Sequence, residues 1–373
     1  MKKVVIICKS ISQYRQEFFN QLRNELQANN IELILIYGKL KNSDSLRNDE
    51  IAIDWAIYIE NKSLRFKKLE IIWQPCTQYL ENADLVIVEN ANKLVINYLL
   101  AFSRYFNSYK FAYWGHGQNL QEKSNSLNNK FKNIFITACD WWFAYTSKVK
   151  AQIVEKKFPS NKITVVQNAI DTKNLIQIYD NINKTVTTQL RNELNINNCN
   201  VGLYCGAMSV EKNIDLVLEA CYLVKKQIPD FHIIFIGSGI DEKKVIKASQ
   251  NENWIHYIGS KFNEEKVKYF KVSDIQIMPY AVGLSILDSF ATETPLVTMK
   301  DSLHGPEIEY LEDGINGFIS NNNINEFAEK IIDILRYKLY KTILPNCRLN
   351  AEKYSIENMV SNFKNGIISC LNS

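Results

Sequence analysis

One strand–loop–helix–strand segment decides the fold of this chain, and it reads Ile277-Met-Pro-Tyr-Ala-Val-Gly-Leu-Ser-Ile-Leu-Asp-Ser-Phe-Ala-Thr-Glu-Thr-Pro-Leu-Val-Thr298. The apolar run before Pro279 predicts a buried strand, and the apolar spacing after Gly283 predicts a helix that begins near Leu284. The apolar run that closes the segment predicts the next strand. Two strands joined by a helix lie parallel in one sheet, so the segment predicts an α/β fold.

The same alternation of apolar runs and amphipathic stretches continues along the whole chain. Strands are predicted at 4–8, 33–37, 85–89, 111–114, 143–146, 202–205, 232–236, 255–258, 275–278 and 296–299. Helices are predicted at 17–28, 94–106, 214–226, 264–272, 284–293 and 324–336. This order predicts two doubly wound, Rossmann-like domains in tandem that face a central cleft.

The length of 373 residues also favours two domains, because one hydrophobic core rarely serves so long a chain. The turn-forming residues Asn168 and Asp171 end a predicted strand, which places the boundary between 1–168 and 169–355. After it, the polar, asparagine-rich stretch 172–200 is typical of a solvated linker and a first surface helix. The apolar spacing of 356–371 predicts a C-terminal helix that packs back on the first domain.

Composition and charge exclude several classes of protein. A net charge of +4 is too small to indicate nucleic-acid binding, but it is compatible with anionic substrates or a lipid headgroup surface. No apolar run approaches the ~18–20 residues of a membrane span, and the start of the chain is interpreted as a first strand rather than a signal peptide. Eight cysteines without a C-x-x-C pair are typical of reduced thiols, so a cytoplasmic protein is expected.

The loop before the predicted helix at 284 is suited to an anionic ligand. Free amides at Gly283 and Leu284 offer hydrogen bonds to a diphosphate, and Asp288, one turn into the helix, can reach toward a ribose diol. Any α/β protein has such corners, however, and Asp288 pointing only to solvent is an equally good interpretation.

A second strand end supplies positive charge. Gly206 closes a predicted strand and Lys212 starts the next helix, where it could neutralise phosphate charge on a departing nucleotide. The alternative is an ordinary surface lysine. No D-x-D and no metal-like spacing of His, Cys and carboxylates occurs in the sequence, so no metal or other cofactor is expected.

In the first domain, His116 stands between two glycines at a strand end, where it could contact a sugar hydroxyl or share a proton. A structural turn is the alternative. Tyr14 and Arg15, after the first strand, are suited to an acceptor that carries hydroxyls or phosphate. Basic and aromatic residues mix at 62–68 and 123–132, which are either solvated faces or a site of peripheral contact with an anionic membrane.

These segments together resemble the retaining GT-B glycosyltransferases of family four, the group 1 type. The resemblance covers nearly the whole chain and is strongest from 163 to 318. It rests on an N-G-V-D-like turn at 168–171, a glycine loop that ends in Lys212, a G-L-x-x-L-E-A-like run at 283–289, and an E-I-x-x-x-x-x-G-x-N-G-like pattern at 307–317.

The resemblance implies a nucleotide-sugar donor bound mainly by the second domain, an acceptor bound mainly by the first, and transfer with retention and without a required metal. It implies a hexosyltransferase that builds a cell-surface polysaccharide, capsule or lipopolysaccharide O-antigen, on a glycan or lipid-linked acceptor. The residues that it implies for catalysis are His116, Lys212 and Asp288. With the residues singled out above, the donor residues are expected to be Gly206, Lys212, Tyr280, Gly283, Leu284, Asp288 and Glu307, and the acceptor residues Tyr14, Arg15 and His116.

Three positions depart from the family's pattern. The usual arginine after the loop glycine is Ala207, the first motif glutamate is Tyr280, and the second is shortened to Asp288. One cation then stands where two are common, and Tyr280 offers a hydrogen bond but no charge. Two alternatives therefore remain open: a GT-B sugar-nucleotide epimerase, and a non-catalytic GT-B partner that stabilises a second transferase.

Overall fold

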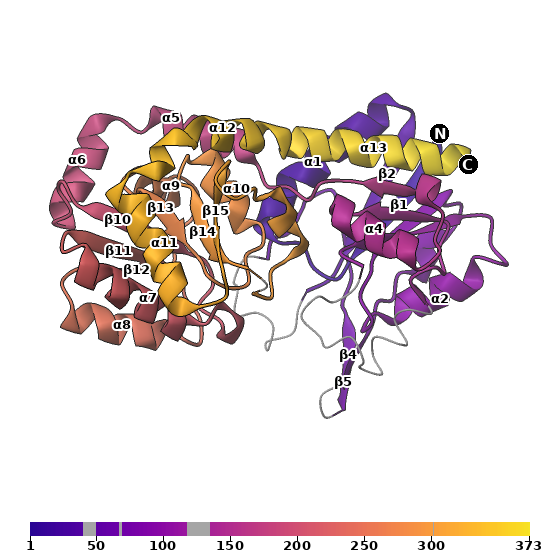
Figure 1. The fold of residues 1–373 in the computed structure, drawn as a ribbon. Coiled ribbons are helices and arrows are strands. Elements are labelled where there is room, and N and C mark those ends of the chain that lie inside the picture. The colour runs from indigo at the N-terminus through magenta and orange to yellow at the C-terminus, as the bar shows by residue number, and fades with distance from the viewer. Residues whose placement is uncertain (40–49, 67–68, 118–134, 301) are drawn as a thin grey trace. The chain divides into compact units, whose positions relative to one another are not determined.

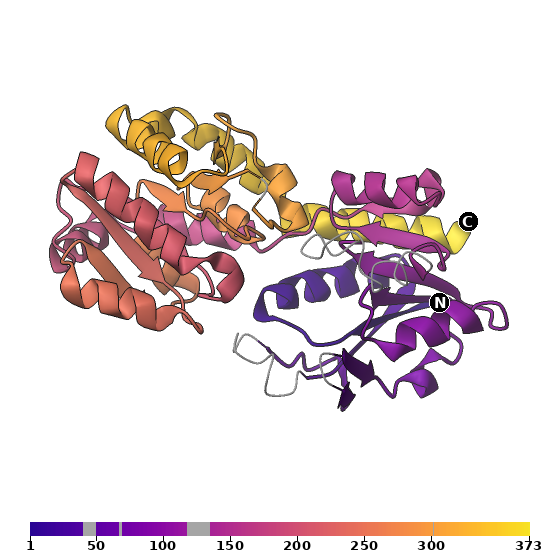
Figure 2. The same cartoon turned by 60° about the horizontal axis from the view of Figure 1, so that its bottom comes forward.

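The computed structural model describes residues 1–39, 50–66, 69–117, 135–300 and 302–373, and these form two compact units (Figure 1). Unit 1 comprises Met1–Ile170 and Ile356–Ser373, and unit 2 comprises Asp171–Ser355. Each unit is an open sheet of parallel strands with helices on both faces (Figures 1 and 2). Two doubly wound α/β units are thus present, as the alternation of the sequence predicts.

The sheet of unit 1 has seven strands in the order β3-β2-β1-β6-β7-β8-β9, and every neighbouring pair is parallel. The strands are β1 (Lys2–Cys8), β2 (Ile31–Tyr37), β3 (Ile57–Tyr58), β6 (Leu85–Glu89), β7 (Lys110–Gly115), β8 (Trp141–Ala144) and β9 (Ile163–Val165). Strands covered on both faces must be apolar throughout, which explains uninterrupted runs such as Val-Val-Ile-Ile in β1.

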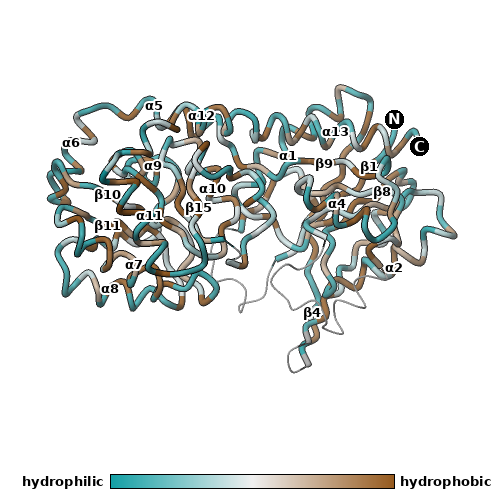
Figure 3. Tube along the Cα trace, viewed as in Figure 1, coloured by the Kyte–Doolittle hydropathy of each residue, from teal (hydrophilic) through white to brown (hydrophobic). Residues whose placement is uncertain are grey.

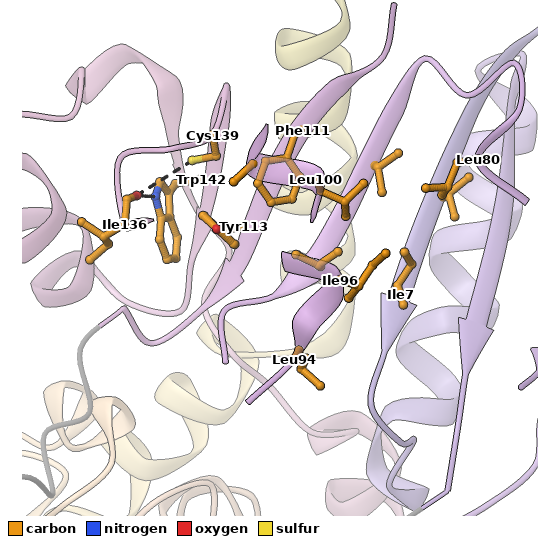
Figure 4. Packing of buried hydrophobic residues seen from close by; sticks show 14 of the residues in the cluster. Ile7, Leu80, Leu94, Ile96, Leu100, Phe111, Tyr113, Ile136, Cys139 and Trp142 are labelled. Atoms are coloured by element: carbon orange, nitrogen blue, oxygen red, sulfur yellow. Dashed lines mark hydrogen bonds between the residues drawn. The ribbon is translucent and has the colours of Figure 1, made fainter. Parts of the chain in front are cut away.

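The helices of unit 1 divide between the two faces of its sheet. They are α1 (Gln16–Ala28), α2 (Val95–Ser103), α4 (Ser147–Glu155) and α13 (Ile356–Asn372). On one face, apolar side chains of α2 and α4 join the strands in a single core, where Leu100 lies beside Phe111 (Figure 4). On the other face, Phe363 of α13 stacks on Phe143 of β8, with ring centroids 4.4 Å apart.

A short antiparallel hairpin stands apart from the main sheet of unit 1. Its strands are β4 (Lys62–Phe66) and β5 (Leu69–Trp73). The sequence predicted a solvated face or a membrane contact at 62–68, and the described part of that stretch belongs to this hairpin. The other basic stretch, 123–132, lies outside the described residues.

The sheet of unit 2 has six parallel strands in the order β12-β11-β10-β13-β14-β15. They are β10 (Asn200–Cys205), β11 (Phe231–Ile236), β12 (Ile255–Gly259), β13 (Ile275–Ile277), β14 (Leu296–Met299) and β15 (Gly317–Ser320). Counted along the chain this is 3-2-1-4-5-6, the strand order of dinucleotide-binding folds. In Figure 3 the hydropathy-coloured trace is brown along the strands and largely teal along the outer turns.

The helices of unit 2 are α5 (Thr172–Asn181), α6 (Lys184–Glu193), α7 (Ile214–Gln227), α8 (Glu242–Asn251), α9 (Asn263–Lys271), α10 (Ser285–Ala291), α11 (Ile324–Arg336) and α12 (Leu344–Lys353). The prediction of a solvated linker within 172–200 is wrong, because α5 and α6 fill most of that stretch. Asp171 and Asn183 accept hydrogen bonds from the first turns of α5 and α6 and so start both helices. Polar composition here marks exposed helix faces.

The boundary between the units falls after Ile170, two residues beyond the predicted one. Asn168 is 2% exposed and accepts a hydrogen bond from Arg15, so its side chain belongs to the interior of unit 1. At the other boundary, α13 runs alongside α1 of unit 1 (Figures 1 and 2). Gly366 lets α13 also pack closely on the sheet, because a Cβ there would stand 2.6 Å from Thr164 Oγ1 of β9.

Among the described helices, none has the length and apolar character needed to cross a membrane. Within the same ranges of the chain, no three His, Cys, Asp or Glu side chains are grouped as metal ligands.

Candidate functional site

The strand order of unit 2 locates its ligand site. Ligands of such sheets bind at the carboxyl ends of the two neighbouring strands from which the chain proceeds toward opposite edges of the sheet. Here these strands are β10 and β13. The loops that follow these two strands are 206–212 and 278–284. They contain five of the residues that the sequence predicted for the donor: Gly206, Lys212, Tyr280, Gly283 and Leu284. Topology alone brings these two loops to the same edge of the sheet.

Lys212 joins the two loops directly. It ends a 3-10 helix (Val210–Lys212), and its ammonium donates a hydrogen bond to the backbone carbonyl of Ala281. Lys212 is half-buried, and its ammonium is held against the second loop instead of extending into solvent. A phosphate oxygen, which is charged, could replace the neutral carbonyl as the partner of this ammonium. A cation at this position is therefore suited to binding phosphate.

Three further hydrogen bonds fix the loop that receives this lysine. The N–H of Ala281 donates to Ser302 O at 3.0 Å, and Gly305 N–H donates to Val282 O at 2.7 Å. The Val282 N–H donates to Nδ1 of His304 at 3.1 Å. Ala281 adopts a left-handed φ of 50°, which costs energy for a non-glycine residue and is maintained by these bonds.

His304 was not selected in the sequence, because nothing in its immediate neighbours indicates a role. Its Nε2 lies 2.7 Å from the backbone oxygen of Met299. A carbonyl can only accept and the Val282 N–H can only donate, so the ring is neutral with its proton on Nε2. The imidazole therefore ties the end of β14 to the loop after β13.

Glu307, which the resemblance assigns to the donor, lies beside the same loop. It belongs to a 3-10 helix (Pro306–Tyr310) and is 5% exposed. A Cβ built on Gly283 would lie 3.9 Å from Glu307 Oε2, and one on Gly305 would lie 2.7 Å from it. Gly305 thus lets the carboxylate approach the loop, whereas a Cβ at Gly283 would make only an ordinary contact with it. Ser285, the first residue of α10, has a buried hydroxyl for which the described residues supply no hydrogen-bond partner.

Asp288 is engaged in a way that the sequence did not indicate. Its Oδ1 forms an ion pair of 2.7 Å with Lys266 of α9, and the two side chains are 14% and 19% exposed. Burial alone would lower the pKa of Lys266, but the charge of Asp288, its hydrogen bond and the nearby Cys205 together outweigh burial, and the pKa is raised. The carboxylate is consequently oriented by Lys266, and a ribose would have to share it.

Tyr280 also has a partner in unit 2. Its hydroxyl lies 3.2 Å from Oδ1 of Asn322, and the residue is half-buried. The phenol is therefore held beside the loop as a hydrogen-bonding group without charge, at the position where the family's pattern has a glutamate.

Glycines directly follow β10 and β11, and of these only Gly206 was predicted from the sequence. Gly206 has an N–H that donates to Ile236 O at 3.0 Å. A Cβ on Gly237 would stand 1.9 Å from Gly206 O, and one on Gly239 would stand 2.6 Å from Met208 O. Both adopt positive φ, 135° and 152°. The G-S-G sequence directly after β11 was the signal for this packing, and it was missed.

The same rule locates a second site in unit 1, where the order reverses between β1 and β6. Glu89 ends β6, and its Oε2 accepts a hydrogen bond of 2.8 Å from the N–H of Lys9, just after β1. Burial raises the pKa of this carboxyl group. Glu89 was missed in the sequence, although an acidic residue that ends an apolar strand is a recognisable signal.

The structure separates the two residues predicted for the acceptor in this loop. Tyr14 is 39% exposed, whereas Arg15 is 7% exposed. The Arg15 guanidinium donates to Asn168 Oδ1 at 2.6 Å and lies 4.7 Å from the centre of the Trp114 ring. It is occupied inside unit 1, so the expected contact of Arg15 with an acceptor is corrected to a role in packing.

His116 lies exposed at the end of β7, between Gly115 and Gly117, which have φ of 148° and 67°. Its ring packs edge-on against Tyr145, with centroids 6.1 Å apart. The positive φ at both flanking positions explains why glycines stand there. His116 and Glu89 follow neighbouring strands, so unit 1 presents both groups at one edge of its sheet.

Comparisons with known proteins agree with this geometry. Residues 199–337 match the sequence model of a family described as "Glycosyl transferases group 1". An uncharacterised glycosyltransferase of Methanocaldococcus jannaschii is 28% identical over 192 residues, which are 50% of this chain and 51% of that protein. A poly(ribitol-phosphate) alpha-N-acetylglucosaminyltransferase of Staphylococcus aureus is 30% identical over 161 residues, 41% of this chain and 32% of that protein. This chain thus spans about half the length, or less, of these two relatives.

Solved structures match over the whole chain. Anabaena HepE in complex with UDP has a TM-score of 0.73 at 15% identity, covering 99% of this chain and 100% of the other. WaaG, a glycosyltransferase involved in lipopolysaccharide biosynthesis, has a TM-score of 0.67 at 12% identity, covering 97% of this chain and 98% of the other. At these identities the likeness establishes the fold, which is GT-B.

Proposed function

Because residues 199–337 form a domain of the group 1 glycosyl transferases within a GT-B fold, we propose that the protein transfers a sugar from a nucleotide-sugar donor to an acceptor. The observation that carries this proposal is the contact of Lys212 with the Ala281 carbonyl, which puts a cation between the loops that follow β10 and β13. UDP is bound by the structurally similar HepE, and a nucleotide diphosphate fits the chemistry of this edge.

The donor binds with its diphosphate at these two loops. Lys212 turns from the Ala281 carbonyl to a phosphate oxygen, and the amides at Gly283 and Leu284 supply further donors. The ribose hydroxyls share Asp288 with Lys266. Lys212 then stabilises the negative charge that grows on the departing diphosphate as the bond from the sugar C1 to the phosphate oxygen breaks.

The acceptor binds to unit 1, at the edge that carries Tyr14, Glu89 and His116. An acceptor hydroxyl forms the new bond to C1, and its proton passes to the departing phosphate. We propose that the configuration is retained and that the transferred sugar is a hexose. We also propose that no metal is required, because Lys212 supplies the positive charge. The names of the relatives, which include a wall-polymer transferase and WaaG, favour a cell-surface glycan, capsule or O-antigen, as the product.

A thermal-shift screen tests donor binding. The purified protein is mixed with UDP-, GDP-, dTDP- and CMP-sugars, each with magnesium and with EDTA. We expect one nucleotide class to raise Tm and the rise to survive EDTA. The Lys212→Ala variant should lose the rise, with affinity reduced roughly 10- to 100-fold. Lys247→Ala, which removes an exposed lysine of α8, is the matched control and should keep it.

The second candidate function is a non-catalytic partner of another transferase. Tyr280 and Ala207 favour it, together with the ion pair that already occupies Asp288. This candidate predicts no rise of Tm with any nucleotide sugar. An epimerase would instead change the donor sugar when no acceptor is present, which chromatography of the nucleotide sugar would reveal.

A further inference from the structure

The helix α10 carries Asp288 and begins at the loop proposed to hold the diphosphate, so its placement decides the geometry of the donor site. Its carboxyl end is bonded directly to Asp288. The N–H and the Oγ1 of Thr292 both donate to the backbone oxygen of Asp288, at 3.0 and 2.7 Å. A displacement of the carboxyl end of this short helix would therefore also displace Asp288.

Glu293, directly after α10, has a strained backbone. Its φ is 48°, in the left-handed region that glycine adopts readily and other residues adopt at a cost. Thr294 N–H donates to Ser289 O at 3.0 Å, and Glu293 N–H donates to Phe290 O at 3.3 Å. This is the hydrogen-bond pattern of a helix end that usually has glycine at the left-handed position. A glutamate stands there instead, so another part of the fold must offset the cost.

The side chain of Glu293 is held by Arg348 of α12. Arg348 Nε donates to Glu293 Oε1 at 2.7 Å. The two other nitrogens of the guanidinium donate to the two carboxylate oxygens of Asp180, near the end of α5, at 2.7 and 3.0 Å. The Arg348 and Glu293 side chains are 22% and 24% exposed, so solvent screens their attraction only in part. We call Asp180, Glu293 and Arg348 the Arg348 clamp.

The Arg348 clamp joins three helices that pack against one another, α5, α10 and α12 (Figure 1). The hydrogen bonds from Arg348 lower the pKa of Asp180, so both acids of the clamp are suited to carry charge at neutral pH. A planar guanidinium that binds one carboxylate through two bonds and a second through another fixes the orientation of all three groups. A lysine at this position could not do so, because its single ammonium lacks this geometry.

We propose that Arg348 is a positioning residue of the donor site. By holding Glu293 in its left-handed conformation, it fixes the carboxyl end of α10 and, through Thr292, the position of Asp288. The assignment of Asp288 to the donor rests on the proposed function, whereas the effect of the clamp on α10 does not. The alternative is an ordinary surface ion pair, which would contribute little and would leave α10 unchanged when it is removed.

Hydrogen–deuterium exchange of the full chain, measured by mass spectrometry on peptides that cover α10, tests the clamp without any ligand. In Arg348→Met the amides of α10 should exchange at least about fivefold faster than in wild type, because the strained residue is no longer held. Arg336→Met, at an exposed position of α11, is the matched control and should exchange like wild type. Glu293→Ala removes the clamp but keeps the strain, so it should also exchange faster.

Glu293→Gly separates the clamp from a general contribution to stability. Glycine adopts the left-handed conformation without help, so this variant should exchange within about twofold of wild type at α10. It should also rescue Arg348→Met, because the double variant no longer has a strained residue to hold. With UDP as the probe, the dissociation constant should rise about fivefold in Arg348→Met and return to within about twofold of wild type in the double variant.

Four results would overturn the proposal. The first is equal exchange of α10 in Arg348→Met and wild type, and the second is an increase by the same factor throughout unit 2, which would indicate a general loss of stability. The third is failure of Glu293→Gly to restore α10. The fourth is faster exchange with unchanged UDP affinity, because the clamp would then serve the helix and not the donor site. If wild-type protein binds no UDP, the proposal of a UDP-linked donor fails, and the exchange data still decide whether the clamp holds α10.

Discussion

His304 and Val282 are joined by a hydrogen bond of 3.1 Å from the Val282 N–H to the imidazole Nδ1. The other ring nitrogen donates to the backbone oxygen of Met299 at 2.7 Å. One side chain thus bridges the end of β14 and the loop that receives Lys212. The loop amides proposed to hold phosphate depend on this bridge, although His304 itself need not touch the ligand.

Replacement of His304 should weaken donor binding in a graded way. In His304→Asn the amide oxygen can still accept from Val282, whereas in His304→Leu the buried Val282 N–H loses its acceptor. We expect the dissociation constant of the nucleotide found in the screen to rise about tenfold in the Leu variant and about two- to threefold in the Asn variant. Calorimetric titration measures both. Equal losses in the two variants would argue against the hydrogen bond as the cause.

The ion pair of Lys266 and Asp288 allows a structural role to be separated from a ligand contact. Lys266→Met would leave the Asp288 carboxylate without its partner at 14% exposure, so the free energy of unfolding should fall by about 2–3 kcal/mol. Lys268→Met, on the same helix, breaks only an exposed pair of 3.7 Å with Glu264 and should change it by less than about 0.5 kcal/mol. Urea denaturation measures the difference.

Asp288→Asn keeps the shape of the side chain and removes its charge. If Asp288 binds ribose, nucleotide affinity should drop about 5- to 10-fold in this variant at conditions where it remains folded. An affinity that is unchanged in Asp288→Asn would limit this residue to its ion pair with Lys266. It would also strengthen the case for a non-catalytic partner.

The sequence predicts the two sheets well because their strands are covered on both faces and are therefore apolar throughout, as in β1 and β11. The hairpin of β4 and β5 was not predicted. Its residues mix basic and apolar types, a composition that a solvated face also shows, and the antiparallel pairing of β4 with β5 is what makes it a hairpin. Within 172–200 the surface helix was predicted correctly and the linker was not, since exposed helices and linkers share a polar composition.

The candidate site could be predicted where its residues directly follow predicted strands. Lys212 and Gly283 follow strands that the order of the sheet makes neighbours, so their meeting follows from topology. Arg15 and Asp288 show what a local pattern omits. Arg15 donates a hydrogen bond to Asn168 and Asp288 forms an ion pair with Lys266, and only the tertiary structure reveals those partners.

Arg15 allows a role in packing to be distinguished from contact with an acceptor. Arg15→Lys retains the charge but cannot reproduce the planar contacts with Asn168 and Trp114, so unfolding should become about 2 kcal/mol easier. Arg336→Lys, at an exposed position of α11, is the control and should stay within about 0.5 kcal/mol of wild type. Tyr14→Ala should leave stability nearly unchanged and raise the KM for the acceptor. A stable Arg15→Lys variant with a raised acceptor KM would restore the original prediction for Arg15.

Two stacked histidines of unit 2 should make its stability depend on pH. His232 of β11 and His256 of β12 lie with Nδ1 and Nε2 3.0 Å apart and their rings nearly parallel. Burial and the neighbouring His232 lower the pKa of His256 to about 4, and burial lowers that of His232. An unfolded histidine titrates near 6.5, so the unfolded chain binds protons first as the pH falls.

The stability from the neutral pair is therefore complete above about pH 6.5 and is lost as the pH falls toward 4. We expect the free energy of unfolding to fall by roughly 2 kcal/mol over this window because of the pair. His256→Gln should flatten the dependence, because glutamine keeps a hydrogen-bonding group without titrating. His116→Gln removes an exposed histidine and should leave the dependence as in wild type. Urea denaturation at half-unit pH steps measures all three proteins, and equal slopes for wild type and His256→Gln would mean that carboxylates, not this pair, govern the loss.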